Sequence, residues 1–471
     1  MDEICKRIDI CESSVGKEYL YLSLHRLMLS QDNLKERSDK AEYIRADVKH
    51  TGRIQKIFKD LGRSKKISFK DYIFRLSELE EKSNIKHIIL GILLLIAIGL
   101  IFIRPLIGVA ALVVMFIINI LDYFKEKGKI EGYFLCVKYL CRMVQCAGRF
   151  AKIGFDGTPF ENDAKRAAEL YRSFGDVSRG SWLITTSVSG SLVDVVMDYI
   201  RMLFHVDLIK FNSSLKKIIQ KSEEVNELYD LLGEIELAFC IAKLRDDLDI
   251  WCIPQFDHHT SYEKHLEFKD IYHLLIEKPV TNSLETDRSI LLTGSNASGK
   301  STFLKSIAIS QIFAQTIYTC PAREYKTDYC KVISSMALND NILGNESYFV
   351  VEIRSIKRIF DAIGDVPVMC FIDEVLRGTN TKERIAASTV ILKHMTDDNV
   401  LAFAATHDIE LTELLEDYMT NYHFSENVED GMVMFDYKLK EGPSDSRNAI
   451  RLLDMYGFDE HIVKEAYFLA K

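Results

Sequence analysis

Residues 294–301 read GSNASGKS, a spacing of glycine, lysine and serine that is typical of a loop binding a phosphate chain. Its glycines let backbone N–H groups close around a phosphate, and the helix expected to follow adds the positive end of its dipole. Lys300 would reach the β- and γ-phosphates, and Ser301 would ligate Mg²⁺. The sequence therefore predicts a site for ATP and Mg²⁺. The predicted nucleotide-binding residues are Gly294, Ser295, Asn296, Ala297, Ser298, Gly299, Lys300, Ser301 and Thr302.

Two carboxylates and a histidine stand at the ends of apolar runs further along the chain. Asp373 and Glu374 end the run VMCFIDE, and His407 ends VLAFAATH. Carboxylates in such a place are costly unless they are used, so we assign Asp373 to the Mg²⁺ shell and Glu374 to the attacking water. His407 could contact the γ-phosphate, although a structural histidine is the alternative. The predicted catalytic residues for ATP hydrolysis are Glu374, His407 and Lys300.

These residues need a sheet to position them. Apolar runs at 289–294, 368–373 and 400–407 alternate with helical patterns, which favours a mostly parallel sheet. A helix is expected at 302–315, directly after the loop. Near Pro254 the long helical patterns give way to short apolar runs, which marks the predicted start of this domain.

The region before that boundary is helical in pattern. Segments 19–29 and 53–62 carry apolar residues at spacings of three and four, and residues 130–250 look similar. Residues 210–244 predict one long helix or a closely joined pair.

An apolar run, residues 88–121, interrupts the helical region and has Arg104 as its only charged residue. One helix of this length would measure about 51 Å, far more than a bilayer core of about 30 Å. We therefore predict two transmembrane spans, 88–103 and 106–121, with the turn at Arg104 and Pro105. A hairpin in one leaflet and a buried hairpin in a soluble core are the alternatives.

Lysines flank the run on both sides, so the positive-inside rule puts both termini and the ATPase domain in the cytoplasm. No secretory signal is expected from the first thirty residues. The ten cysteines include no CxxC pair, which favours reduced thiols over a zinc site or a disulfide framework. The net charge of −9 argues against broad affinity for DNA without excluding local basic patches.

Taken together, the motifs resemble the MutS family of the ABC ATPase superfamily. GSNASGKST is similar to the family's GPNxxGKST, DEVLRGTN (373–380) to DELGRGTS, and SYFVVEI (347–353) to STFMVEM. The resemblance implies that Ser347 is supplied across a dimer to the partner's ATP. It also implies that the ATPase domains form a homodimer with composite sites. YKLKEGPSDSRNAI (437–450) and the helical segment 231–244 resemble further parts of the family.

Some positions depart from the family pattern. Ser295 replaces its proline, and Leu376 stands where it has glycine. The domain with which mismatch-reading members recognise DNA has no counterpart here, and the hairpin interrupts the core region instead. Mismatch recognition by this chain alone is therefore not expected.

The predicted fold class is α plus α/β: a helical core and lever region with an inserted transmembrane hairpin, then an ABC-type P-loop ATPase domain with a mostly parallel sheet. The predicted domains are a first helical part (1–82), the hairpin (83–124), a second helical part (125–255) and the ATPase domain (256–471).

The function expected is that of a membrane-anchored MutS-type ATPase, whose hydrolysis in composite dimer sites drives a conformational switch. The alternative is a DNA-binding mismatch-repair or recombination-related protein tethered by the hairpin. A transporter subunit fits less well, because no LSGGQ-like signature occurs. A nucleotide-binding scaffold without turnover also stays open.

Overall fold

The computed structural model describes residues 1–63, 68, 83–178, 192–256, 264–295, 298–336, 348–377, 379–396, 399–429, 432–444 and 457–469. The chain divides into two compact units. One comprises Met1–Arg7, Ser23–Ser38 and Leu244–Lys471, and the other comprises Ile8–Leu22 and Asp39–Lys243. The domain limits predicted above remain a prediction.

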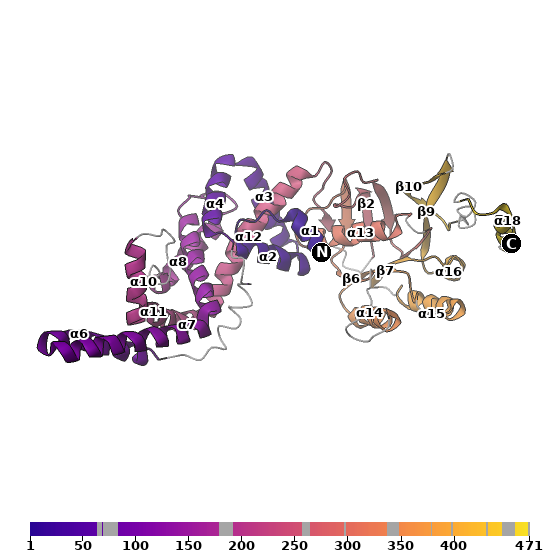
Figure 1. The fold of residues 1–471 in the computed structure, drawn as a ribbon. Helices are drawn as coiled ribbons and strands as arrows, with labels where there is room; N and C mark the ends of the chain where they lie inside the picture. The colour runs from indigo at the N-terminus through magenta and orange to yellow at the C-terminus, as the bar shows by residue number, and fades with distance from the viewer. Residues whose placement is uncertain are drawn as a thin grey trace. The chain divides into compact units, whose positions relative to one another are not determined.

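The second unit is helical, as its sequence pattern predicts. Helices α1 to α3 and α12 each contribute residues to both units. The long predicted helix at 210–244 is a joined pair, since α11 and α12 are separated at Lys221. The helices up to α12 are α1 (Asp2–Ile8), α2 (Ser14–His25), α3 (Asp32–Ala46), α4 (Val48–Leu61), α6 (Ile85–Ile103), α7 (Pro105–Phe150), α8 (Glu161–Ser173), α9 (Gly175–Ser178), α10 (Leu192–Phe204), α11 (Val206–Gln220) and α12 (Ser222–Asp247) (Figure 1).

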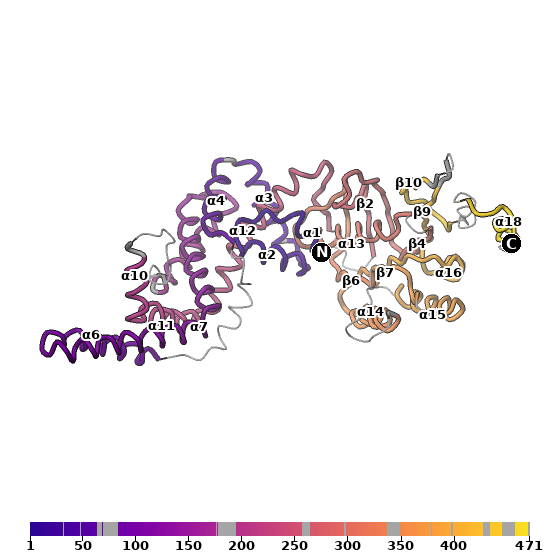
Figure 2. Tube along the Cα trace, viewed as in Figure 1, coloured from indigo at the N-terminus to yellow at the C-terminus, as the bar shows by residue number. Residues whose placement is uncertain are grey.

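Helices α6 and α7 form an antiparallel hairpin whose turn lies at Arg104, as predicted (Figure 2). Pro105 is the first residue of α7, where its missing N–H costs no hydrogen bond. Gly108 lets the helices approach closely, because a Cβ there would lie 2.4 Å from the Ile101 backbone nitrogen. Helix α7 continues without a break to Phe150, so its second half packs inside the helical unit while its first half belongs to the hairpin.

The other unit is built on a six-stranded sheet in the order β10-β9-β4-β8-β7-β6. All neighbouring strands in it are parallel except β10, which pairs antiparallel with β9. The mostly parallel sheet is therefore confirmed. Its strands are β4 (Ile290–Thr293), β6 (Lys331–Ser335), β7 (Val368–Asp373), β8 (Val400–Ala405), β9 (Thr420–Glu429) and β10 (Met432–Glu441).

Both faces of this sheet are covered, which explains why its central strands read as continuous apolar runs. Alternate residues face opposite cores: Phe371 and Phe403 pack on the side of α13 (Lys300–Ala314), with rings stacked 5.3 Å apart. Cys370 and Ala402 face the opposite side, where α14 (Tyr348–Ala362) and α15 (Thr381–His394) pack.

A second sheet of four strands, which the sequence did not predict, has the order β1-β5-β2-β3. Strands β2, β3 and β5 are half polar, and their buried residues join the core on the α13 side. The bounds are β1 (Gln255–Phe256), β2 (Leu266–Ile271), β3 (Asn282–Thr286) and β5 (Glu324–Thr327), and the remaining helices are α16 (Glu410–Leu414) and α18 (Glu460–Leu469).

Candidate nucleotide-binding site

The glycine-rich loop connects β4 to α13, which is the strand–loop–helix context that the motif requires. Gly294 has φ +139°, and a Cβ there would lie 2.6 Å from the carbonyl oxygen of Phe424. Gly299 has φ +108° and is the N-cap of α13. Both positions therefore need glycine, the first for conformation and space and the second for conformation. Asn296 and Ala297 lie outside the described residues.

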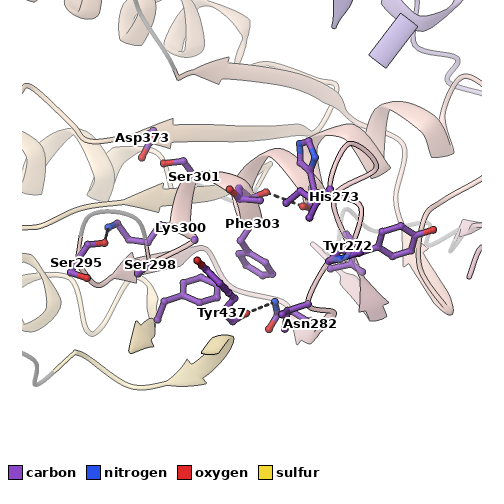
Figure 3. Close-up of a pocket in the computed structure, with 18 of the residues that line it drawn as sticks. Tyr272, His273, Asn282, Ser295, Ser298, Lys300, Ser301, Phe303, Asp373 and Tyr437 are labelled. Carbon is purple, nitrogen blue, oxygen red and sulfur yellow. Dashed lines mark hydrogen bonds between the residues drawn. The ribbon is translucent and has the colours of Figure 1, made fainter. Parts of the chain in front are cut away.

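Lys300 is the first residue of α13, and its ammonium group folds back over the loop. Nζ donates to the carbonyl oxygens of Gly294 at 2.7 Å and Ser295 at 2.9 Å (Figure 3). Burial lowers the pKa of Lys300 to about 8, although the carboxylates of Asp373 and Glu374 oppose that shift. A buried cation with backbone carbonyls as its main partners is well suited to meet a phosphate.

The residues predicted to hold Mg²⁺ point toward one another. Ser301, in the first turn of α13, and Asp373, at the end of β7, lie next to each other at one end of the pocket (Figure 3). Nearby Ser298 is buried, and its hydroxyl has no hydrogen-bond partner among the described residues. An unsatisfied buried hydroxyl beside a hydroxyl–carboxylate pair fits a bound Mg²⁺–nucleotide, which offers oxygen acceptors.

Glu374 is held between two cationic or hydrogen-bonding partners. Its Oε1 lies 3.0 Å from Nε2 of His407, and its Oε2 lies 2.6 Å from Nε of Arg377. Its backbone has φ +61° and its N–H donates to the carbonyl of Ala405 at 2.9 Å, which fixes the residue at the strand end. The hydrogen bond from His407, more than the charges of Arg377 and Lys300, lowers the pKa of Glu374, so it is ionised at neutral pH.

Glu352 on α14 supports the same turn. It is buried, and its Oε1 accepts a hydrogen bond from the backbone N–H of Arg377 at 3.3 Å. Burial raises the pKa of Glu352, against the backbone hydrogen bonds it accepts. Ser347, which the family resemblance assigned to a partner's ATP, lies just before α14 and outside the described residues.

One cavity of about 530 Å³ is lined by every described member of the predicted site except Gly294. The structure therefore brings together residues that are more than a hundred positions apart in the sequence. The size is within the range of pockets that hold nucleotide-sized ligands. The predicted site residues on its wall are Ser295, Ser298, Gly299, Lys300, Ser301, Thr302, Asp373, Glu374 and His407.

The same cavity extends to residues that the sequence analysis missed. Tyr272 and His273 follow β2, and Phe303 and Tyr437 line the wall beside the loop. Asn282, on the same wall, holds Tyr437 in place, since its Nδ2 donates to the carbonyl oxygen of Tyr437 at 3.0 Å (Figure 3). Tyr437 begins the YKLKEG motif, so a signal for it existed. Tyr272 and His273 stand in no motif that could have marked them.

A glycine-rich strand–loop–helix with a buried lysine, and an Asp–Glu pair at the end of a parallel strand, define a P-loop nucleotide-binding domain. Residues 290–471 match the family described as MutS domain V. The similarity to the MutS family is carried by this C-terminal part of the chain.

Individual relatives agree with that family. The chain is 26% identical to the DNA mismatch repair protein MutS of Natronomonas pharaonis over 55% of its own length and 30% of the relative's. It is 30% identical to the protein of the same name from Lactobacillus acidophilus, over 56% of its own length and 31% of the relative's. It is also 30% identical to MutS protein homolog 4 of Mus musculus, over 51% of its own length and 28% of the relative's. The chain thus spans less than a third of the length of these relatives.

Proposed function

We propose that this protein is a Mg²⁺-dependent ATPase that hydrolyses ATP at the site between β4 and β7. Lys300 binds the β- and γ-phosphates, and the backbone of the loop cradles them. Mg²⁺, held by Ser301 and Asp373, would neutralise charge on the phosphates. The nucleobase side of the cavity is the wall that contains Tyr272 and His273.

One observation carries this proposal: Glu374 is paired with His407 in the same cavity as Lys300. A carboxylate that accepts a hydrogen bond from His407 at 3.0 Å is available to orient an attacking water and accept its proton. A scaffold that only binds nucleotide has no need for a charged carboxylate beside the phosphate loop. The hydrogen bond from His407 lowers the pKa of Glu374 and fixes the position of its carboxylate.

The test is phosphate release from MgATP by the full chain, reconstituted in lipid nanodiscs. Lys300→Ala should lower the rate by about 100-fold or more, because it removes the cation that meets the transferred phosphoryl group. Lys305→Ala is the matched control, since this lysine lies on the same helix and is exposed. Equal rates for the parent and Lys300→Ala would assign the activity to another site or to a contaminant.

We further propose that each ATP is enclosed by two subunits, with Ser347 supplied by the partner. In a symmetric dimer, each chain then gives one phosphate loop and one serine to different sites. Lys300→Ala and Ser347→Ala chains should each be inactive alone. Mixing them rebuilds one intact site in each mixed dimer, so activity should return to about a quarter of the parent rate. No recovery after subunit exchange would contradict the composite site.

We also propose that the α6–α7 hairpin inserts into a membrane. Helix α6 has a mean hydropathy of 2.6 over its most apolar window, and only 17% of that window is buried in the protein. Its 19 residues would span about 28 Å, close to the thickness of a bilayer core. Many large side chains on it, such as Leu95 and Phe102, are exposed, which is unfavourable in water.

Both termini and the ATPase domain would then lie on the cytoplasmic side, with Arg104 at the far interface. Retention in the membrane fraction after alkaline extraction supports insertion, and release into the supernatant contradicts it. A chain lacking residues 85–121 should lose retention if the hairpin is the anchor.

A second candidate function is DNA binding, and the similarity to DNA mismatch repair proteins favours it. The net charge of −9 opposes it. Binding of the chain to duplex and branched DNA should be measured over a salt series, because phosphate-mediated binding weakens steeply with salt. No binding at low salt would exclude this candidate and leave a DNA-independent ATPase.

A further inference from the structure

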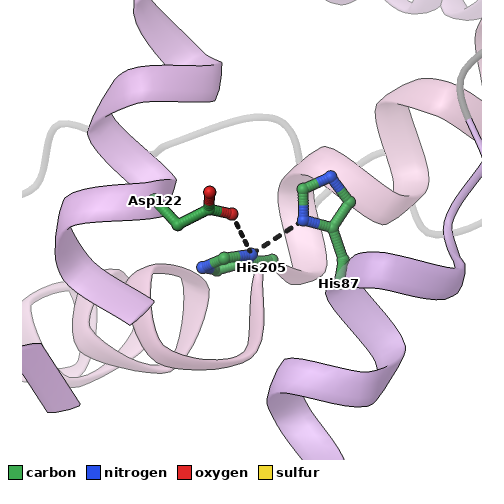
Figure 4. A group of neighbouring side chains, drawn as sticks. All are labelled: His87, Asp122 and His205. Carbon is green, nitrogen blue, oxygen red and sulfur yellow. Dashed lines mark hydrogen bonds and ion pairs between the residues drawn. The ribbon is translucent and has the colours of Figure 1, made fainter. Parts of the chain in front are cut away.

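Three side chains from separate segments converge where the α6–α7 hairpin joins the helical unit (Figure 4). His87 lies in the first turn of α6, Asp122 lies on α7, and His205 is the residue between α10 and α11. One potential metal-ligand atom from each lies within 4.8 Å of the others. Among the described residues, only these His, Cys, Asp or Glu side chains converge as a group of three.

The hydrogen bonds of His205 leave a ring nitrogen free to coordinate. Its Nε2 lies 3.0 Å from the backbone carbonyl oxygen of Asn119, which can only accept, so Nε2 carries the proton. In the neutral ring Nδ1 is then unprotonated, and it faces Nδ1 of His87 at 2.8 Å. A histidine that donates one N–H to a backbone carbonyl and presents its other nitrogen is the usual arrangement of a metal ligand.

Asp122 contributes an oxygen with no hydrogen-bond partner among the described residues. Its Oδ1 accepts from Lys86, whereas its buried Oδ2 lies 4.0 Å from Nδ1 of His205. The Lys86 side chain is 54% exposed, so its ammonium group can turn to solvent or to Glu126, 3.8 Å away. A buried, unsatisfied carboxylate oxygen is costly unless a cation or donor meets it.

Asn119 adds a second unsatisfied group. It lies one helical turn before Asp122, is fully buried, and already contacts His205 through its carbonyl. Neither its side-chain oxygen nor its side-chain nitrogen has a partner in the described part of the chain. A site rich in unmet polar atoms points to a missing occupant.

His205 is also held in an unusual conformation. It has φ +53°, in the left-handed region that only a few per cent of residues other than glycine adopt, histidine more often than most. This conformation lets the chain break between α10 and α11 and turns the imidazole into the interior, where it is completely buried. Uncommon backbone conformations that are maintained at this depth are concentrated at functional positions.

We propose that His87, Asp122 and His205 bind a divalent transition-metal ion of the zinc class. The ligand atoms are Nδ1 of each histidine and Oδ2 of Asp122. Zinc accepts two imidazoles and a carboxylate, with bonds of about 2.0–2.2 Å and a fourth position for water. Tetrahedral coordination would separate the two nitrogens by about 3.3 Å. The imidazoles must therefore move apart by about half an ångström.

The ion would clamp both helices of the hairpin to the segment that begins α11. This site is separate from the ATP site, and its existence does not rest on hydrolysis. The competing arrangement is a metal-free hydrogen bond in which Nδ1–H of His87 donates to His205.

The test uses the full chain in nanodiscs, stripped with a chelator, dialysed and titrated with Co²⁺, then with Zn²⁺. The proposal predicts that about one Co²⁺ per chain binds, with the visible absorption of a four-coordinate ion, and that Zn²⁺ displaces it. Asp122→Asn and His205→Asn should each weaken binding at least tenfold. Asparagine also tolerates the left-handed conformation at position 205.

His50→Gln is the matched control. His50 pairs with Asp47 at 2.7 Å in the same unit, but among the described residues no third His, Cys, Asp or Glu completes a group there. Its removal should leave the Co²⁺ spectrum unchanged. Absence of Co²⁺ absorption in a parent chain with native circular dichroism would overturn the proposal. So would an equal loss of binding in His50→Gln and Asp122→Asn.

Discussion

Nε2 of His407 lies 3.0 Å from Oε1 of Glu374, and the two residues come from the ends of adjacent parallel strands, β8 and β7. The sequence predicted both as catalytic residues without indicating that they form a pair. The pair makes the state of Glu374 depend on His407, since their hydrogen bond is the largest influence that lowers the pKa of Glu374.

Replacing His407 by asparagine should therefore change the pH dependence of hydrolysis. Burial raises the pKa of Glu374, and the hydrogen bond from His407 that counteracts it would be lost. Glu374 would therefore protonate at a higher pH. The acid limb of kcat against pH should move upward, and the rate at neutral pH should fall about 10- to 100-fold. The exposed His394, replaced in the same way, provides the control. A lower rate with an unchanged acid limb would mean that His407 does not act through Glu374.

The affinity for ATP should decrease above about pH 8. Burial lowers the pKa of Lys300 to about 8 in the free protein, whereas bound phosphates favour the charged lysine. Binding above that pH must therefore take up a proton, and affinity should fall by at most about tenfold per pH unit. Fluorescence titration with a labelled ATP analogue between pH 7 and pH 9.5 measures this. A dissociation constant that stays flat over this range would contradict the assignment of Lys300.

The same shift has the opposite consequence for the stability of the free protein. Because the folded state favours neutral Lys300, its burial is unfavourable below pH 8. That penalty fades as pH rises toward the ordinary pKa of 10.5. This contribution of Lys300 to stability should be measured as the difference between the parent and Lys300→Met in denaturant titrations.

Gly294→Ala should disrupt the phosphate loop. The backbone at φ +139° is strained for alanine, and the added Cβ would meet the Phe424 carbonyl oxygen at 2.6 Å. We expect a loss of about 1–3 kcal/mol in the free energy of unfolding and no thermal stabilisation by MgATP. Gly364→Ala, whose Cβ would meet nothing within 4 Å, should be within about 0.5 kcal/mol of the parent. Equal stabilisation of Gly294→Ala and the parent by MgATP would show that this glycine is dispensable.

A second pair of glycines tests the packing of the hairpin. Gly108→Leu should separate α6 from α7, because its Cβ would lie 2.4 Å from the Ile101 backbone nitrogen. Gly99→Leu, with nothing within 4 Å, should leave the hairpin intact. Hydrogen exchange in nanodiscs should be faster near the turn in Gly108→Leu alone. The same protection in both variants would mean that the helices do not pack as described.

The sequence was sufficient for those parts of the fold in which local chemistry determines the residues. A phosphate loop requires glycines at particular backbone conformations, and Gly294 and Gly299 have them. Strands buried on both faces are apolar along almost their whole length, so β4, β7 and β8 could be predicted from their apolar runs. The turn at Arg104 could be predicted because a single helix over residues 88–121 would be longer than a bilayer core is thick.

Other parts were hidden because they depend on contacts between distant segments. Strand β2 reads LEFKDI, whose charged residues gave no apolar run, although its buried positions join the core. The hairpin was predicted to end at residue 124, but charges on a helix surface do not end a helix, and α7 continues through the lysines that follow. His87, Asp122 and His205 are far apart in the sequence, and no spacing rule could have brought them together.

ATP hydrolysis at this site is tested most directly by comparing ATP binding and turnover in Glu374→Gln. Glutamine keeps the size of the side chain but cannot accept a proton from water. Glu374→Gln should bind MgATP with an affinity near that of the parent, while single-turnover hydrolysis falls by about 100-fold or more. Hydrolysis by Glu374→Gln at the parent rate, with ATP binding intact, would contradict ATP hydrolysis at this site.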